Sequence, residues 1–492
     1  MDQPSSINSL PQELLEYIFD LHVNFNLRSR YPLLQMCRQW YQTTTSCPNL
    51  WRSIALCSSV SLLPPETVLC KNLKSLSTVI KRTGSSSFEL YLGDTFAGLE
   101  IEDVQRFVDS VDGSWLSQCR SLTVGAQNMQ DPLKGLGSLF FSGNLSSLEM
   151  FEIRHHGRHF PWKHILHTIM EKINSSSLGL KELRIRVMGL ILDAGTGWIT
   201  RNIYRWPNVL RRINRVLLRD TCEPIPWSSF VNLEHIEVWC DQESHPLIKL
   251  DIPPVKYLTI KVTHNPNHLI PQNVWSQLTH LTLKNTIDEF GPFTLDLPSL
   301  ISLRLIVCGI DLRHIRAPKL EELTWTVDTM DDVGPFYNEL EQDAPFTPRV
   351  VHIDIQTTEE PFDLFDIFAQ NIPLWIKVEE LYLKVVGEEQ LLETVIFEAL
   401  SGEYLEQCYP KLHSLTVIYR LPATLEDIGG DDNGQYYQVV AAEHMRALLA
   451  GRVKNEVGVP MKRLEVGWYV DWGDDYVESE WRIVKWIDCL PP

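Results

Sequence analysis

The chain has 492 residues, of which 44 % are hydrophobic and 22 % charged, a balance typical of folded proteins that excludes a largely disordered chain. Its net charge of −19 argues against general nucleic-acid binding. No apolar run approaches the length of a membrane span and the N-terminus lacks a leader, so the sequence predicts neither membrane insertion nor secretion. Ten cysteines without a CxxC pair are typical of reduced thiols in a cytosolic or nuclear protein.

The charge is unevenly distributed along the chain. Residues 154–219 hold thirteen Lys and Arg against three Asp and Glu, a balance of +10. Residues 320–492 hold twelve against thirty-four, a balance of −22, while residues 1–60 are neutral with four of each sign. This asymmetry indicates that partners of opposite charge meet different parts of the chain.

The first fifty residues predict three short helices that cannot bury all their apolar residues alone. Ser9 caps the first helix, Pro11 sits in its first turn, and Pro32 and Pro48 begin the second and third. Two apolar stripes on so small a unit indicate that one faces inward and the other faces a partner. The apolar residues at helical spacing are Leu10, Leu14, Leu15, Ile18, Phe19 and Leu21, then Leu33, Met36, Cys37 and Trp40, then Leu50 and Trp51.

This segment resembles an F-box. It carries, in order, LPQELL from residue 10, an Ile at position 18, CRQW from residue 37 and PNLW from residue 48. The family uses such a unit to bind a Skp-type adaptor, which tethers it to a cullin-based ubiquitin ligase. The resemblance implies that Leu50 and Trp51 close the local core or the joint to the rest of the chain and that the adaptor is bound by Leu10, Pro11, Leu14, Ile18 and Trp40. The alternative is a generic helical hairpin with a leucine face.

Residues 57–87 are expected to link this unit to the rest of the chain. A Ser- and Pro-rich joint is followed by a predicted helix at Glu66–Arg82, and alternation of Phe88, Leu90 and Leu92 predicts a strand. The domain boundaries expected are therefore 1–56 for the F-box, 57–87 for the linker and 88–492 for the remainder.

Residues 88–492 repeat the phrase L-x-x-L-x-L, with other aliphatic residues allowed, thirteen times. The central spacings from Val216 to Leu323 are 20, 22, 23, 22 and 20 residues, the period of leucine-rich repeats. Leucine-rich repeats usually carry Asn or Cys three residues after the last aliphatic of this phrase. Here only Cys308 fits that position in full, so we expect an irregular solenoid. The fourth positions of the phrase, used below as markers, are Leu122, Phe151, Leu183, Val216, Ile236, Leu258, Leu281, Leu303, Leu323, Ile353, Leu381, Leu415 and Leu464.

The expected fold class is therefore α/β, with a three-helix F-box followed by a leucine-rich-repeat solenoid that has a curved parallel sheet. Longer spacings between outer repeats leave room for inserted helices at 162–174, 361–369, 388–400 and 437–454. An ordinary α/β sheet with recurring leucines is the alternative.

The sequence contains no catalytic constellation, and we expect neither enzymatic activity, a metal nor a cofactor. The histidine cluster at positions 155, 156, 159, 164 and 167 lacks nearby cysteines and matches no zinc spacing, so a basic surface is favoured over a metal site.

Two stretches are candidate binding surfaces for a target protein. Arg184 and Arg186 flank strand aliphatics, project to one face and suit an acidic partner. At the C-terminus aromatic residues alternate with carboxylates and suit a basic peptide, or else cap the end of the solenoid. The residues singled out there are Trp468, Trp472, Asp474 and Asp475.

Together these features predict a substrate-recognition subunit of an SCF-type ubiquitin ligase, which acts by bringing a protein target close to the ligase. Its expected partners are the Skp-type adaptor, the cullin ligase behind it and an unidentified protein target, without nucleic acid or membrane. One alternative is an adaptor-bound scaffold without degraded targets. A third hypothesis is a hydrolase or transferase on a repeat fold, for which the sequence contains no motif.

Overall fold

The computed structural model divides into two compact units, Met1–Val238 (unit 1) and Trp239–Pro492 (unit 2), which are described separately. The residues that it describes are 10–25, 30–57, 67–93, 101–111, 115–127, 144–156, 163–176, 179–188, 205–219, 227–240, 252–262, 272–284, 295–306, 312, 315–327, 346–355, 376–385, 410–421, 462–471 and 481–488.

Unit 1 begins with a helical segment, residues 10–51, that contains α1 (Gln12–Phe25), α2 (Arg30–Met36), α3 (Arg38–Ser46) and the 3₁₀ turn η2 (Pro48–Trp51). The single helix predicted from Pro32 is wrong, because α2 ends before Cys37. Cys37 has extended backbone and its Sγ accepts a hydrogen bond from the Trp40 amide, which makes it the N-cap of α3. Three α-helices and a 3₁₀ turn thus occupy the stretch where three short helices were predicted.

The joint between this segment and the sheet also differs from the prediction. The helix expected at Glu66–Arg82 begins only at Leu73, as α4 (Leu73–Thr83), and the strand β2 (Val68–Cys70) precedes it. Asn72 sets this start: its side chain accepts from the Ser75 amide while the Ser75 hydroxyl accepts from the Asn72 amide, a capping box. The strand β1 (Ser53–Leu56) was not predicted at all.

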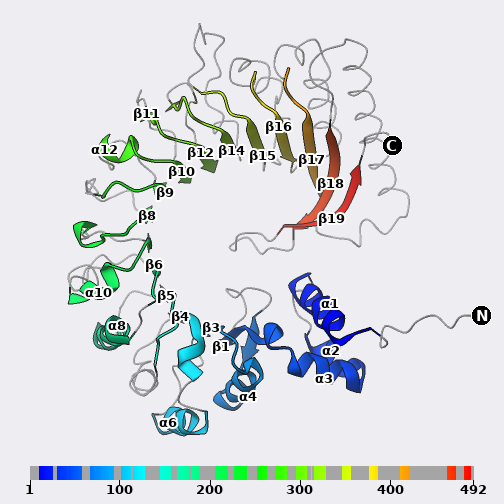
Figure 1. Ribbon diagram of the computed structural model, residues 1–492, viewed down its shortest axis with the longest axis vertical. Coiled ribbons are helices and arrows are strands. Elements are labelled where there is room, and N and C mark those ends of the chain that lie inside the picture. Colours follow the sequence, from blue (N-terminus) through cyan, green and yellow to red (C-terminus); the bar gives the residue numbers. More distant parts are fainter. Residues whose placement is uncertain are drawn as a thin grey trace, which may run out of the picture. The chain divides into compact units, whose positions relative to one another are not determined.

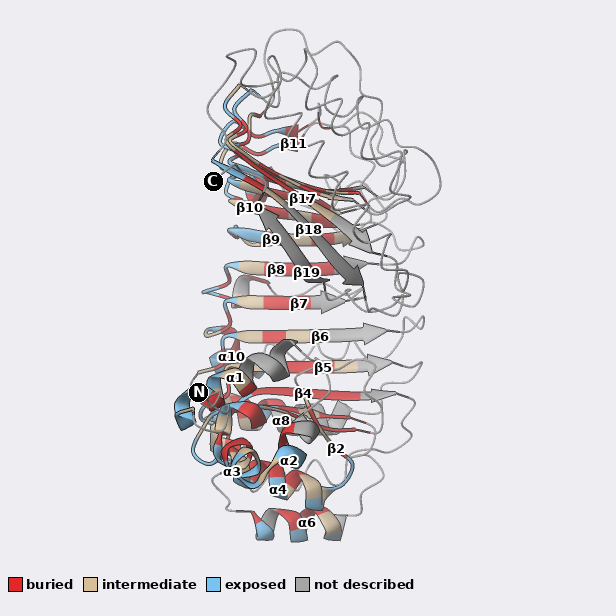
Figure 2. Cartoon of the chain, turned by 90° about the vertical axis from the view of Figure 1, so that its right-hand side faces the viewer, coloured by how far each residue is buried: buried red, intermediate tan, exposed pale blue. Residues whose placement is uncertain are grey.

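Unit 1 continues as parallel strands with helices on one side (Figure 1). The strand pairings give the order β2-β1-β3-β4-β5-β6-β7, and the amides of Glu234 and His235 donate to the carbonyl of Asn214, which brings the start of β8 beside β7. Figure 2 shows β4 to β7 running side by side in one direction. The further elements are β3 (Phe88–Leu92), α6 (Ile101–Ser110), η3 (Trp115–Gln118), β4 (Cys119–Gln127), β5 (Met150–His156), α8 (Lys163–Ser176), β6 (Glu182–Met188), α10 (Pro207–Leu210), β7 (Arg215–Arg219), η5 (Trp227–Ser229) and β8 (His235–Cys240).

Unit 2 contains a second run of parallel strands in the order β9-β10-β12-β14-β15-β16-β17-β18. The last strand, β19, pairs antiparallel to β18, so the sheet is not parallel to its end. The elements are β9 (Tyr257–Val262), α12 (Gln272–Trp275), β10 (His280–Lys284), β11 (Leu295–Asp296), β12 (Ser302–Ile306), β13 (Ile315–Arg316), β14 (Glu322–Val327), β15 (Val350–Ile355), β16 (Glu380–Val385), β17 (Ser414–Leu421), β18 (Arg463–Asp471) and β19 (Trp481–Asp488). The short strands β11 and β13 form a separate parallel pair.

The repeated phrase gives the core of both units. All thirteen marker residues are at most 1 % exposed. Markers on paired strands lie directly opposite one another, with one exception: Val351, not Ile353, is in register with Leu323 and Leu381. The marker assigned to β15 was therefore two residues late.

The α/β class and the repeating parallel strands are as predicted from the sequence. The helix expected at 162–174 is α8, and the strand expected at 88–92 is β3. The helices expected at 361–369, 388–400 and 437–454 lie outside the described residues. Within the part of the chain that is described, no helix has the length and apolarity needed to cross a bilayer.

Candidate interaction surfaces

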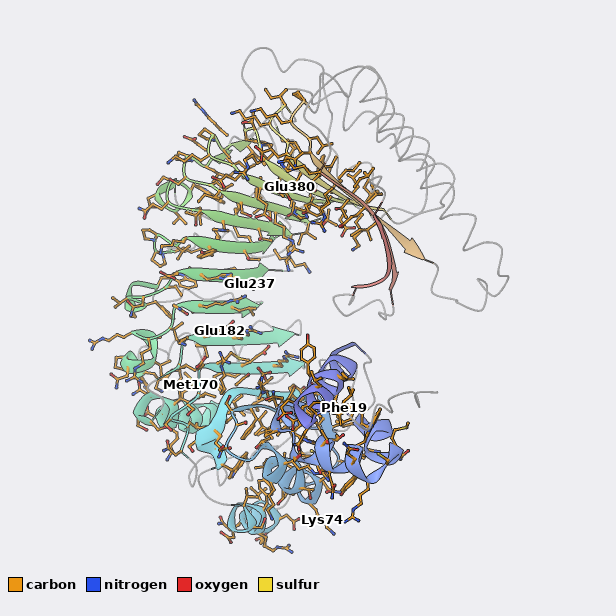
Figure 3. The ribbon with its side chains drawn as sticks, turned by 45° about the vertical axis from the view of Figure 1, so that its right-hand side comes forward. Phe19, Lys74, Met170, Glu182, Glu237 and Glu380 are labelled. Carbon is orange, nitrogen blue, oxygen red and sulfur yellow. The ribbon has the colours of Figure 1, made fainter. Side chains whose placement is uncertain are left out.

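The helical segment has an inner and an outer set of apolar residues. Leu15 and Phe19 on α1 are fully buried, and Leu33, Leu50 and Trp51 are at most 4 % exposed. Phe19 lies among the helices of this segment in Figure 3. The burial of Leu50 and Trp51 agrees with the expectation that they close the local core.

The outer set consists of Leu14, Tyr17, Met36 and Tyr41, which are exposed by 50, 62, 64 and 48 %. Leu14 and Tyr17 are three residues apart on α1 and therefore share one face of that helix. Four of the eight exposed large hydrophobic residues among those described fall within this short stretch. Contiguous exposed apolar patches mark interaction sites, and the shared helix face of Leu14 and Tyr17 is a candidate for one.

The residues predicted to bind an adaptor take different places in this segment. Pro11 is exposed, and its carbonyl accepts from the amides of Leu14 and Leu15 at the start of α1. Leu10 and Ile18 are half-buried. Trp40 is also half-buried, and its ring lies 4.8 Å from that of Phe19, so it joins α3 to α1 as well as reaching the surface. Tyr17, Met36 and Tyr41 were missed as surface residues.

The second candidate surface is the polar face of unit 1, which consists of the residues that alternate with the buried aliphatics on β4 to β8. Glu182 and Glu237, labelled in Figure 3, belong to it. Register places its residues in rows that cross the strands. One row contains Thr123, Glu152 and Arg184, and the next contains Gly125, Arg154, Arg186 and Arg219.

Ion pairs connect the strands across this polar face. Arg154 donates to both carboxylate oxygens of Glu152, at 2.8 and 3.1 Å, and the Thr123 hydroxyl donates to the same group at 3.4 Å. The Nε of Arg184 donates to Glu182 at 2.7 Å, while its Nη1 lies 4.0 Å from Glu152. The carboxylate of Glu152 is therefore held by two neighbouring strands and by its own.

Arg215 extends the network toward β8. Its Nε lies 3.2 Å from Glu182 and its Nη2 lies 3.8 Å from Glu237. Burial acts to lower the pKa of Arg184, but the hydrogen bond and charge of Glu182, together with Glu152 and Glu237, raise it above the ordinary value. Arg184 is therefore fixed in place as a cation.

Tyr91 on β3 lies beside this network. Its hydroxyl oxygen is 2.5 Å from where a Cβ of residue 125 would stand, so only glycine at that position admits the ring. The guanidinium of Arg154 lies 5.8 Å from the centre of the same ring, within cation–π range.

Arg184 and Arg186 stand at alternating positions of β6, and their neighbours in register differ. The Arg184 side chain is 25 % exposed and engages Glu182 and Glu152. Arg186 occupies the neighbouring row, opposite Arg154 and Arg219. Arg154 and Glu152 were not predicted from the sequence as partners, although Arg154, Arg186 and Arg219 each stand three residues after a marker.

Unit 2 carries stacked rings on the corresponding polar positions of its strands. Tyr257 and His280 stack with centroids 4.4 Å apart, and His352 and Tyr382 stack at 4.3 Å with nearly parallel planes. Burial lowers the pKa of His280 and of His352, against the opposing charge of Glu322. Both imidazoles are therefore held toward the neutral form.

Of the C-terminal residues predicted to bind a basic peptide, only Trp468 lies in the described part of the chain. It belongs to β18 and is opposite Lys485 on β19. Trp472, Asp474 and Asp475 lie outside the described residues.

No group of three His, Cys, Asp or Glu among the described side chains is placed to hold a metal ion, and the side chains of the predicted histidine cluster lie outside this set. Burial raises the pKa of Cys70 to about 12 and that of Cys119 still further, so these two thiols stay protonated at neutral pH.

Comparisons with known proteins leave the family open. No protein-family model matches the sequence, and a search of curated proteins finds no significant match.

Proposed function

We propose that the chain is a substrate-recognition subunit of an SCF-type ubiquitin ligase, with residues 10–51 as an F-box and the repeats as the target-binding part. The observation that carries this proposal is the set Leu14, Tyr17, Met36 and Tyr41, large apolar side chains exposed on a helical segment whose inner apolar set is already buried. A Skp-type adaptor that covers these side chains would remove them from water, which stabilises the complex.

The sequence motifs support the same assignment. LPQELL, CRQW and PNLW coincide with the start of α1, the start of α3 and the turn η2. The chain would make or break no bond itself; it would raise the effective concentration of a target near the ligase. A cytosolic or nuclear location belongs to this proposal, and the thiols of Cys70 and Cys119, which form no disulfide, support it.

The adaptor assignment is tested with Leu14→Ala/Tyr17→Ala in the full chain and a purified Skp-type adaptor, by biolayer interferometry. We expect the dissociation constant to rise at least about tenfold, because two large anchors are truncated. The matched control is Val231→Ala/Ile301→Ala, which removes two other exposed apolar side chains, at 71 and 39 % exposure, and should change the constant less than about twofold. Failure of the unmodified chain to bind, or equal effects of both variants, would overturn the assignment.

The ligase role is tested separately in cells by proximity labelling with and without proteasome inhibition. A ligase receptor accumulates ubiquitinated neighbours when the proteasome is inhibited, and the Leu14→Ala/Tyr17→Ala variant should lose them. Adaptor binding without such accumulation would instead favour the scaffold function.

A further inference from the structure

Three arginines form one row across the polar face of unit 1. Arg154 on β5 is directly opposite Arg186 on β6, and Arg186 is directly opposite Arg219 on β7. Parallel strands are about 4.8 Å apart, so the three backbone positions span about 10 Å. We call Arg154, Arg186 and Arg219 the arginine row.

The polar positions of these strands hold more positive than negative charge. β5, β6 and β7 have five arginines there, the three of the row with Arg184 and Arg215, against Glu152 and Glu182; with Glu237 of β8, which lies 3.8 Å from Arg215, the excess is two positive charges. Like charges directly opposite one another destabilise a sheet. The stability of the sheet therefore does not explain the row, whereas an anionic partner would.

The surroundings of the row suit a peptide that lies across the strands. At one end the row meets Gly125, over which the Tyr91 ring lies, and the Arg154 guanidinium is 5.8 Å from that ring. Tyrosine offers an apolar surface and a hydroxyl to an incoming chain. On the adjacent row Glu152 holds Arg154 in a fixed two-point ion pair, so this guanidinium is preorganised.

We propose that the arginine row is a docking surface for an acidic, extended segment of a protein partner. Guanidinium groups bind carboxylates and phosphates through paired hydrogen bonds, and the row repeats this group on three successive strands. A protein segment is favoured over nucleic acid because a chain of net charge −19 repels a long polyanion outside this local patch. The inference rests on the proposed function in one respect: the partner would be the target of the ligase subunit.

The test uses the full chain and fluorescence anisotropy at low ionic strength. The probe is a short fluorescein-labelled peptide of alternating Glu and Ser, beside the same peptide with Gln for Glu, one with phosphoserine for Ser, and a single-stranded oligonucleotide of similar length. The variant is Arg186→Gln/Arg219→Gln. The matched control, Arg106→Gln/Arg211→Gln, removes the same charge from exposed positions on α6 and just after α10.

We expect the Glu peptide to bind the unmodified chain and the Gln peptide not to bind. The Arg186→Gln/Arg219→Gln variant should weaken Glu-peptide binding at least about tenfold, and the control less than about twofold. Tighter binding of the phosphoserine peptide, with the same dependence on the row, also supports the proposal and assigns phosphate as the preferred anion.

Equal weakening by both variants, or no binding of either anionic peptide, overturns the proposal. Tighter binding of the oligonucleotide than of the peptides overturns it in favour of nucleic acid. Each preparation is also tested against the Skp-type adaptor. Circular dichroism shows whether the variants are folded, and retained adaptor binding separates failure of this inference from failure of the proposed function.

Discussion

Glu152 is only 1 % exposed, although it lies on the polar face of the sheet rather than in the aliphatic core. A carboxylate removed from water loses its hydration, and this loss is large unless charged donors replace the water. Arg154 and Thr123 supply three hydrogen bonds, and Arg184 adds a cation at 4.0 Å. The arginines in turn keep their positions because Glu152 is there.

Replacing Glu152 by alanine should leave Arg154 and Arg184 without this carboxylate. Because both arginine side chains keep 21 and 25 % exposure, water offsets part of the loss, and we expect the free energy of unfolding to fall by about 2–4 kcal/mol. Urea denaturation of the full chain measures this loss in the free energy of unfolding. Glu149→Ala is the control, since Glu149 pairs with Arg120 at 35 % exposure and should cost less than about 1 kcal/mol. Similar losses in both variants would contradict a structural role for Glu152.

At the scale of elements, α4 shows how a local signal fixes a boundary that periodicity alone places wrongly. Leu69 and Leu73 are four residues apart, so helical spacing extends backward past the true start of the helix. The capping box of Asn72 and Ser75 satisfies two amides that a helix start leaves without partners, and the chain before it forms β2 instead. Caps thus decide where α4 begins, and packing against η2 and α6 decides which face it buries.

Asn72→Ala should remove this cap and lower the free energy of unfolding by about 1 kcal/mol, the usual cost of losing an N-cap side chain. The hydrogen bond from the Ser75 amide to Asn72 Oδ1, 2.9 Å long, is the one lost. Lys71→Ala, at the exposed residue just before it, is expected to change stability by only a few tenths of a kcal/mol. The prediction fails if the two variants have the same urea midpoint.

At the scale of the molecule, the sequence predicts the repeating core well because each marker is an aliphatic residue that must be buried. It fails at β15, where Val350, Val351, Ile353 and Ile355 allow two phases of the same phrase. The neighbours Leu323 and Leu381 select the phase that puts Val351 in the core row. Alternation within a strand does not contain this information, since it comes from the adjacent strands.

In the candidate surfaces, too, local features can be predicted from the sequence and contacts between elements cannot. The motifs that we propose to bind an adaptor are local in the sequence and can be recognised there, but only the packing of α1 separates exposed Leu14 from buried Leu15. The arginine row was within reach of sequence, because Arg154, Arg186 and Arg219 share one offset from their markers. The ion pairs of Glu152 and Arg215 depend on side-chain geometry between strands, so they could not be predicted from the sequence.

The strand β1 joins the helical segment to the sheet, and this limits where the chain can be cut. Ile54, Ala55 and Leu56 are at most 1 % exposed, and β1 lies between β2 and β3. Trp51, just before it, donates to the Thr44 carbonyl at 2.9 Å and has the Arg82 guanidinium 4.4 Å from its ring centre. A boundary placed after residue 56 therefore removes a strand from the sheet along with the helices.

We expect deletion of residues 1–65 to expose the edge of β3 and the apolar residues that β1 covers, so that the protein aggregates or unfolds at a lower temperature. Deletion of residues 1–46 keeps η2 and β1 and should remain monomeric, with a thermal midpoint closer to that of the full chain. Size-exclusion chromatography and thermal unfolding followed by circular dichroism compare the two. If both deletions behave alike, β1 is dispensable to the sheet. If only the longer deletion aggregates, β1 is part of the sheet, and the proposed adaptor binding is better removed by Leu14→Ala/Tyr17→Ala than by truncation at residue 65.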